Sequence, residues 1–216
     1  MLSTRTMSFI RSIALVVLAA ALVAGCGGSA HPATSTDHDE AATTGPAAVT
    51  LPGASNPAAF AWLHPAPAPP GWAVAHLSDR AVLPYPSSWQ RVHSDPQTVS
   101  AARSDARTGL IEQYLNATPQ QGDETLQNWS TFRPGHNQEE GDSHIQVIAA
   151  ARGLRFRDGQ GSCVIDRYRT PRTTYQEIAC LVSGPHGGNV IVAATQPAHW
   201  AQDAPTLEQA VSAFLA

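Results

Sequence analysis

Two apolar segments in the C-terminal part of the chain flank a short polar turn. Residues 162–169 and 174–182 are rich in β-branched and aromatic side chains, and Thr-Pro-Arg-Thr at 170–173 separates them. This pattern predicts an antiparallel hairpin. If the hairpin is symmetric about the centre of the turn, Cys163 lies opposite Cys180. Because opposite Cα atoms in such a ladder are about 4.5 or 5.5 Å apart, which is within disulfide reach, we expect these two cysteines to be bonded.

The segments before this hairpin carry further strand patterns. Strands are predicted at residues 73–77, 81–83, 98–103, 110–116 and 190–194. The first two flank a polar turn, and the next two flank a turn in which Gly109 can adopt a positive φ. We therefore expect two more hairpins, and we place Trp89, between them, in the core.

Two other segments have helical spacing. Asp123 is a suitable N-cap for a helix that Pro134 and Gly135 end. The apolar stripe of this helix consists of Leu126, Trp129 and Phe132. A closing helix is predicted to begin at Asp203 or Thr206, and its buried face consists of Leu207, Ala210, Val211 and Phe214.

The segment 142–153 fits either a helix or a strand. Ile145, Ile148 and Ala149 have helical spacing, whereas an alternating pattern fits a strand equally well. The three consecutive alanines at 149–151 favour the helix slightly. With strands, a helix, more strands and a final helix in this order, the chain is predicted to be α+β, an antiparallel sheet with helices packed on it.

The N-terminal residues have the composition of an export signal. Arg5 and Arg11 precede an apolar run from 13 to 24, and small residues follow. The run is shorter than the ~20 residues that a membrane-spanning helix needs. A positive start, a short apolar run and small residues at its end are typical of a secretory signal peptide. We therefore expect residues 1–25 to be removed.

The end of this signal is more specific. Val-Ala-Gly-Cys at 23–26 resembles the lipobox of bacterial lipoproteins. The resemblance implies cleavage between Gly25 and Cys26, a diacylglyceryl group on the Cys26 thiol and an acylated amine on the same residue. The protein would then be anchored by lipid to the extracytoplasmic face of the cell membrane. In that oxidising compartment, Cys163 and Cys180 are expected to form a disulfide.

Residues 26–70 are predicted to be a disordered tether, and residues 71–216 a single domain. The tether is rich in Ala, Thr, Ser, Gly and Pro, and has little apolar surface to bury. Phe60 and Trp62 are unusual in a linker and could dock weakly on the domain.

Composition excludes several classes of function. The chain has no lysine, so Walker A nucleotide binding and Schiff-base catalysis are excluded. Its formal net charge is −4, and it becomes −6 when residues 1–25, with two arginines and no acid, are removed. An acidic chain without a basic stripe is not expected to bind nucleic acid.

A short motif suggests a family. Tyr85-Pro86-Ser87-Ser88-Trp89 is similar to the early Tyr-Pro-x-x-Trp element of PsbP-like domains. This resemblance implies an antiparallel sheet sandwiched by helices, with the last helix after the last strand. Actinobacterial envelope lipoproteins of this fold share the layout of lipobox, tether and domain. The resemblance implies a role in binding rather than in catalysis.

Arginines concentrate in one stretch of the otherwise acidic domain. Strand alternation puts Arg155 and Arg157 on one face, and likewise Arg167 and Arg169. These four residues are a candidate basic face for docking to anionic lipid or to an acidic envelope protein. The competing interpretation is an exposed sheet face whose charge is balanced by Asp158, Asp166 and Glu177.

No catalytic constellation is recognisable. Neither Gly-x-Ser-x-Gly nor His-Glu-x-x-His occurs, and no metal site, cofactor or catalytic residue is predicted. The sequence therefore favours a non-enzymatic lipoprotein whose domain binds a protein or an amphipathic envelope ligand. Two other hypotheses remain, an envelope hydrolase with an unrecognised site and a small solute-capture lipoprotein.

Overall fold

The computed structural model describes residues 55–216. Within this range, a seven-stranded antiparallel sheet has the order β3-β4-β5-β9-β8-β7-β6. Its strands are β3 (Gln90–Val92), β4 (Val99–Ser104), β5 (Ile111–Pro119), β6 (Ser143–Arg155), β7 (Gln160–Arg169), β8 (Thr174–Gly184) and β9 (Gly187–Thr195). The predicted first hairpin forms a separate pair, β1 (Ala73–His76) with β2 (Val82–Tyr85).

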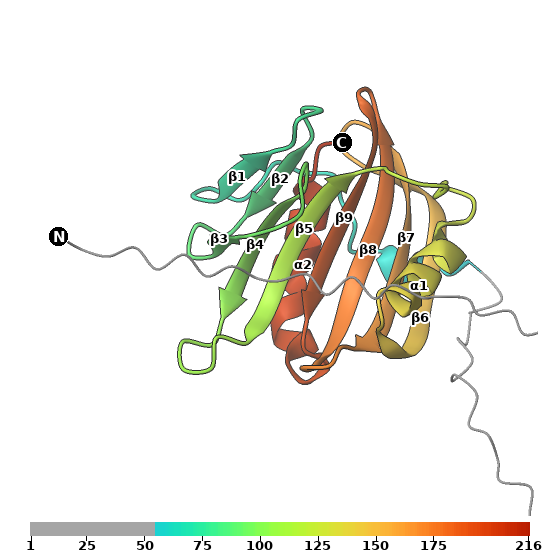
Figure 1. The fold of residues 1–216 in the computed structure, drawn as a ribbon. Coiled ribbons are helices and arrows are strands. Elements are labelled where there is room, and N and C mark those ends of the chain that lie inside the picture. Colours follow the sequence, from blue (N-terminus) through green and yellow to red (C-terminus); the bar gives the residue numbers. More distant parts are fainter. Residues whose placement is uncertain (1–54) are drawn as a thin grey trace, which may run out of the picture. The chain divides into compact units, whose positions relative to one another are not determined.

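Helices cover both faces of the large sheet (Figure 1). Helix α2 (Trp200–Ala213) packs on one face, where Leu207 and Val211 meet Ile178 and Ile191 in the main core. Helix α1 (Trp129–Glu139) packs on the opposite face, where Trp129 joins a second apolar cluster. The expected α+β class, with helices packed on an antiparallel sheet, is confirmed.

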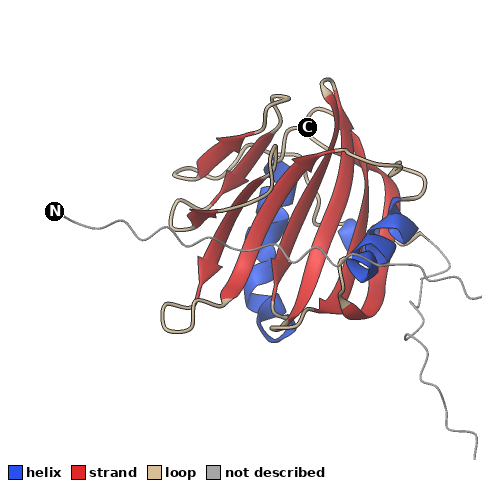
Figure 2. Cartoon of the chain, viewed as in Figure 1, coloured by secondary structure: helices blue, strands red, loops and turns tan. Residues whose placement is uncertain are grey.

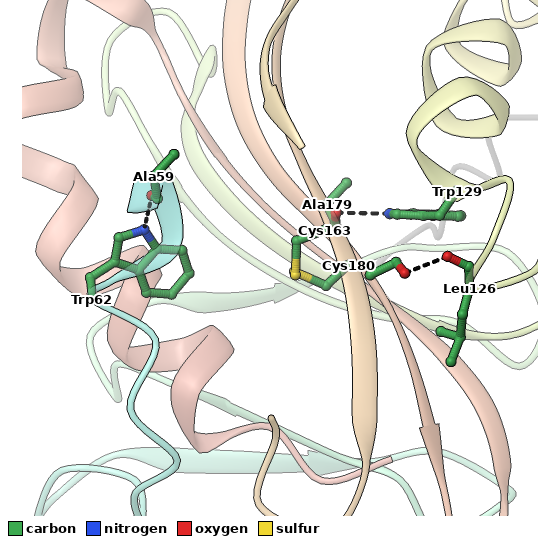
Figure 3. Close-up of a disulfide and its surroundings, with 8 residues drawn as sticks. Ala59, Trp62, Leu126, Trp129, Cys163, Ala179 and Cys180 are labelled. Atoms are coloured by element: carbon green, nitrogen blue, oxygen red, sulfur yellow. Dashed lines mark hydrogen bonds between the residues drawn. A yellow bond between two sulfur atoms is a disulfide. The ribbon is translucent and has the colours of Figure 1, made fainter. Parts of the chain in front are cut away.

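The β7–β8 hairpin has the register that the sequence predicts. Cys163 pairs with Cys180 and Tyr168 with Tyr175. The two cysteines form the expected disulfide, with a Cα–Cα distance of 4.1 Å. The disulfide belongs to the main core on the α2 side, whereas Trp129 lies on the other side of the sheet and donates a hydrogen bond to the carbonyl oxygen of Ala179 at 2.9 Å (Figure 3).

Packed structure extends N-terminal to residue 71, where the sequence predicts the domain to begin. A short 3-10 helix, η1 (Pro57–Phe60), precedes it, and Phe60 is only 3% exposed. The amide of Asn56 donates to the carbonyl of Ala150 at 2.7 Å, and the amide of Ala66 donates to Ser212 at 3.2 Å. Phe60 anchors this segment because its ring is buried in the main core.

The segment 142–153, where the alanine run favours a helix slightly, is a strand. It forms most of β6, at the edge of the sheet beside β7 (Figure 2). Three register shifts interrupt the pairing of β6 with β7, and they break the alternation that would reveal a strand. Gly153, with φ of +69°, lies at one of these irregularities.

Helix α1 begins and ends later than predicted. Two reciprocal hydrogen bonds hold the turn before the helix. The amide of Thr125 donates to Oδ1 of Asn128, and the amide of Asn128 donates to Oγ1 of Thr125. Asp123 therefore does not cap it. The helix continues through Pro134, which is buried together with Asn137. Packing against the sheet outweighs the one backbone hydrogen bond that proline cannot make.

The closing helix is also longer than expected. Helix α2 begins at Trp200, directly after the 3-10 helix η2 (Pro197–His199), and not at Asp203 or Thr206. Asp203 is buried in the first turn, where Oγ1 of Thr195 donates to its carboxylate at 2.7 Å. The predicted buried face is confirmed, since Leu207, Ala210, Val211 and Phe214 are each 0% exposed.

Candidate functional site

The residues that the sequence singles out fall into three places. Gly25 and Cys26, the predicted cleavage and lipidation residues, lie outside the described residues. Cys163 and Cys180 are joined in the core. The arginines of the predicted basic face lie in β6, β7 and the turn between them.

The structure does not bring the four arginines together. Arg155 pairs with Gln160 at the start of β7, and Arg167 lies seven residues farther along, about 23 Å on a strand that rises ~3.3 Å per residue. Arg157 lies in the β6–β7 turn and donates to the carbonyl of Ala213. Because paired residues share a face and successive residues alternate, Arg155 lies on the face opposite Arg167 and Arg169.

A cleft of about 220 Å³ opens beside α1, on the face of the sheet opposite α2. The helix contributes Trp129, Phe132, Arg133 and His136, and the ends of β5 and β9 contribute Pro119 and Val190. The loop before α1 forms another wall of the cleft. The carboxylate of Glu124 holds this loop, because it accepts hydrogen bonds from the backbone amides of Gln121 and Gly122 at 2.8 Å each.

Three aromatic rings form a row along the cleft side of α1. The rings of Trp129 and Phe132 stack with centroids 6.1 Å apart, and those of Phe132 and His136 stack at 5.9 Å. Trp129 is 2% exposed and is fixed by its hydrogen bond to β8. The spacing of three and four residues places all three rings on one helix face, and this gives the cleft an apolar wall.

Arg133, in the same helix, forms a buried ion pair with Glu177 of β8. Nε and Nη2 donate to the two carboxylate oxygens at 2.7 and 3.0 Å. The side chain of Arg133 is 12% exposed and that of Glu177 is 0% exposed. A guanidinium has five N–H donors, so donors remain on Arg133 beyond the two that bind Glu177.

A second carboxyl group lies directly opposite Glu177. Asp166 of β7 is its partner in the ladder, and both residues are 0% exposed. Burial raises the pKa of Asp166 well above its ordinary value, and the negative charge of Glu177 raises it further, while Arg133 lowers it. Among the described residues, neither oxygen of Asp166 has a hydrogen-bond partner. The neutral acid is therefore favoured at this position.

Tyrosines extend the polar cluster across the sheet. The hydroxyls of Tyr114 and Tyr168 are 2.6 Å apart, and Tyr175 donates to the carbonyl of Ile111 at 2.7 Å. Burial raises the pKa of both Tyr114 and Tyr168. All three phenols therefore stay neutral and act as hydrogen-bonding groups.

Burial decides which of these charged groups can contact a molecule in the cleft. Asp166 and Glu177 are completely buried, so neither reaches a molecule in the cleft, whereas Arg133 lines it. No motif in the sequence points to Arg133, and the competing interpretation of the arginine-rich stretch puts Asp166 and Glu177 on an exposed face. One signal was present: the register that pairs Cys163 with Cys180 also pairs the two acids.

Within residues 55–216, no group of three His, Cys, Asp or Glu side chains converges as a set of metal ligands. None of the helices in this range has the length and apolar character needed to cross a membrane.

No protein-family model matches the chain, and no curated protein matches it in sequence. Solved structures are similar in fold at low identity. The PsbP protein (CyanoP) of the cyanobacterium Synechocystis has 15% identity and a TM-score of 0.49, over 67% of this chain and 92% of that one. LpqN of Mycobacterium tuberculosis, described as involved in cell envelope biogenesis, has 12% identity and a TM-score of 0.41, over 66% and 88%.

A protein of unknown function from Pseudomonas aeruginosa has 13% identity and a TM-score of 0.43, over 67% of this chain and 96% of that one. All three TM-scores are below 0.5.

Proposed function

We propose that this protein is a non-enzymatic envelope lipoprotein, anchored through Cys26, whose folded domain binds a small amphipathic ligand in the cleft beside α1. The lipobox-like sequence at 23–26 supports the anchor and the extracytoplasmic location. The disulfide between Cys163 and Cys180 is consistent with folding in an oxidising compartment.

The observation that carries the binding role is the combination of an apolar wall with one buried cation. Phe132, with the buried ring of Trp129 stacked against it, offers an apolar surface, and Arg133 offers unused N–H donors at the same cleft. Sites for small molecules have this composition, mostly apolar with a few placed polar groups. The cleft therefore fits a ligand with an apolar body and an oxygen acceptor at one end.

The net charge of the cluster formed by Arg133, Glu177 and Asp166 indicates which kind of oxygen acceptor the ligand can carry. Glu177 compensates Arg133, and burial favours the neutral form of Asp166. The cluster is thus close to neutral, and the acceptor can be an uncharged carbonyl as well as a carboxylate. The volume of about 220 Å³ is below the roughly 300–1,000 Å³ of sites for drug-sized ligands. We therefore expect a short acyl chain and not a large lipid.

Titration with decanoate and with its methyl ester tests this proposal. The protein is the chain from residue 26 onward with Cys26→Ser, which cannot be lipidated, and backbone amide shifts are followed by NMR. Both probes are expected to shift the amides around Gln121, Phe132 and Val190, which line the cleft.

A matched pair of variants locates the binding. Gln121→Trp fills the cleft from its exposed rim and is expected to abolish the shifts, whereas Gln127→Trp adds the same bulk at an exposed position that does not line the cleft. The proposal fails if neither probe shifts these amides up to its solubility limit, or if both variants weaken binding equally.

A further inference from the structure

A second cleft, of about 300 Å³, lies at the far end of the sheet from Arg155, where the β7–β8 turn faces the connection from β9 to η2. Arg169 and Arg172 line it together with Thr173, Thr174 and Gln196. No acidic residue is among its lining residues.

Both arginines are exposed and uncompensated within the described part of the chain. Neither forms an ion pair with any carboxylate in residues 55–216, although the whole chain has a formal net charge of −4. This contrasts with Arg103, which lies near Glu112 and Asp203, and with Arg133, which binds Glu177. The cleft is thus a local positive site in an acidic protein.

The backbone that carries these arginines is rigidly held. Oγ1 of Thr170 accepts the amides of Arg172 and Thr173 at 3.1 Å each, and it donates to the carbonyl of Thr173 at 3.0 Å. Arg169 is paired with Thr174 in the ladder. Because the turn is ordered before any ligand arrives, binding an anion there costs little backbone entropy.

We propose that this cleft binds a phosphate group. Two guanidinium groups can each donate two parallel hydrogen bonds to phosphate oxygens. The hydroxyls of Thr173 and Thr174 and the side-chain amide of Gln196 line the same cleft and can supply further donors. The site is separate from the α1 cleft, and its test does not depend on the outcome there. The phosphate can belong to an anionic lipid headgroup or to a soluble phosphate ester.

Two measurements distinguish these sources, both on the chain from residue 26 onward with Cys26→Ser. The first is cosedimentation with phosphatidylcholine vesicles that contain or lack phosphatidylglycerol. The second is an NMR titration of the same protein with inorganic phosphate, in which the amides of Thr173 and Thr174 are followed.

The test variant is Arg169→Gln/Arg172→Gln, and the matched control is Arg152→Gln/Arg155→Gln. Both remove two exposed arginines and change the net charge equally, but Arg152 and Arg155 lie in β6 away from this cleft. At ~1 kcal/mol per arginine near an anionic surface, the test variant should bind phosphatidylglycerol vesicles about 30-fold more weakly. The control should bind like the parent protein, and thermal melting should show that both variants are folded.

Loss of vesicle binding confined to the test variant supports a lipid headgroup. Phosphate-induced shifts at Thr173 and Thr174 without vesicle binding support a soluble phosphate ester. The proposal is overturned if neither probe binds, or if the control variant loses binding as much as the test variant does.

Discussion

Replacing Arg133 with methionine should destabilise the fold far more than the loss of an ordinary ion pair. The pair with Glu177 has two hydrogen bonds, at 2.7 and 3.0 Å, and its side chains are 12% and 0% exposed. Removing the cation leaves Glu177 buried without compensation, beside Asp166. Breaking a buried pair in this way costs about 3–5 kcal/mol, a large part of the ~5–15 kcal/mol stability of a typical domain.

Urea unfolding of the Cys26→Ser chain, followed by circular dichroism, measures this loss. Two further variants show its origin. Glu112→Gln removes the partner of Arg103 in a partly exposed pair, with side chains 44% and 25% exposed, and should cost less than about 1 kcal/mol. Arg133→Met/Glu177→Gln removes both charges and should recover most of the stability that Arg133→Met loses.

The double variant is decisive because it separates an unpaired buried charge from lost packing. If Arg133→Met/Glu177→Gln is as unstable as Arg133→Met alone, the packing of the arginine stem explains the loss. If Arg133→Met is within about 1 kcal/mol of the parent protein, the pair is not desolvated as the structure indicates. Either result refutes the account of a buried charge cluster under α1.

Three other outcomes are expected. Burial raises the pKa of Asp166 in the folded state. The contribution of this carboxyl group to the free energy of unfolding is therefore most favourable below its unfolded pKa of about 4. That contribution is lost as the pH rises through the folded pKa. Asp166→Asn should therefore gain stability relative to the parent as the pH rises, and equal pH profiles of the two in urea unfolding would contradict this. Cys163→Ala/Cys180→Ala removes the disulfide between residues 17 apart and should lower the free energy of unfolding by ~3 kcal/mol in the same assay. Two free thiols in non-reducing mass spectrometry of the parent protein would contradict this prediction. Cys26→Ala should abolish labelling by a fatty-acid analogue and shift the protein out of the membrane fraction, and unchanged labelling would argue against the anchor.

Local patterns predict the three hairpins, and they predict the closing helix except for its start at Trp200. The Thr-Pro-Arg-Thr turn determines the β7–β8 register, and from it follow both the Cys163–Cys180 contact and the pairing of Asp166 with Glu177. The sequence therefore predicts that Asp166 and Glu177 lie side by side, but it does not predict that they are buried. The acids looked like surface charges because nothing in the strands indicates that α1 covers them.

The failures are at elements whose partners are distant in sequence. Strand β6 resembles a helix locally, because its alanine run and its register shifts hide the alternation, and it is a strand because β7 offers an open edge. Helix α1 passes through Pro134 because burial of its inner face against the sheet stabilises it. Packed structure begins before residue 71 because the ring of Phe60, which the sequence predicts to dock only weakly, reaches the main core.

By itself, the sequence determined the α+β class, the β7–β8 register and the disulfide, since the register and the disulfide depend on one turn and the class on strong local patterns. Only the tertiary structure decided where the charged side chains meet. It placed Arg133 against Glu177, 44 residues away, and it separated Arg155 from Arg169 along the length of β7. Such contacts depend on which helix packs on which face, and the periodicity of one segment cannot contain that information.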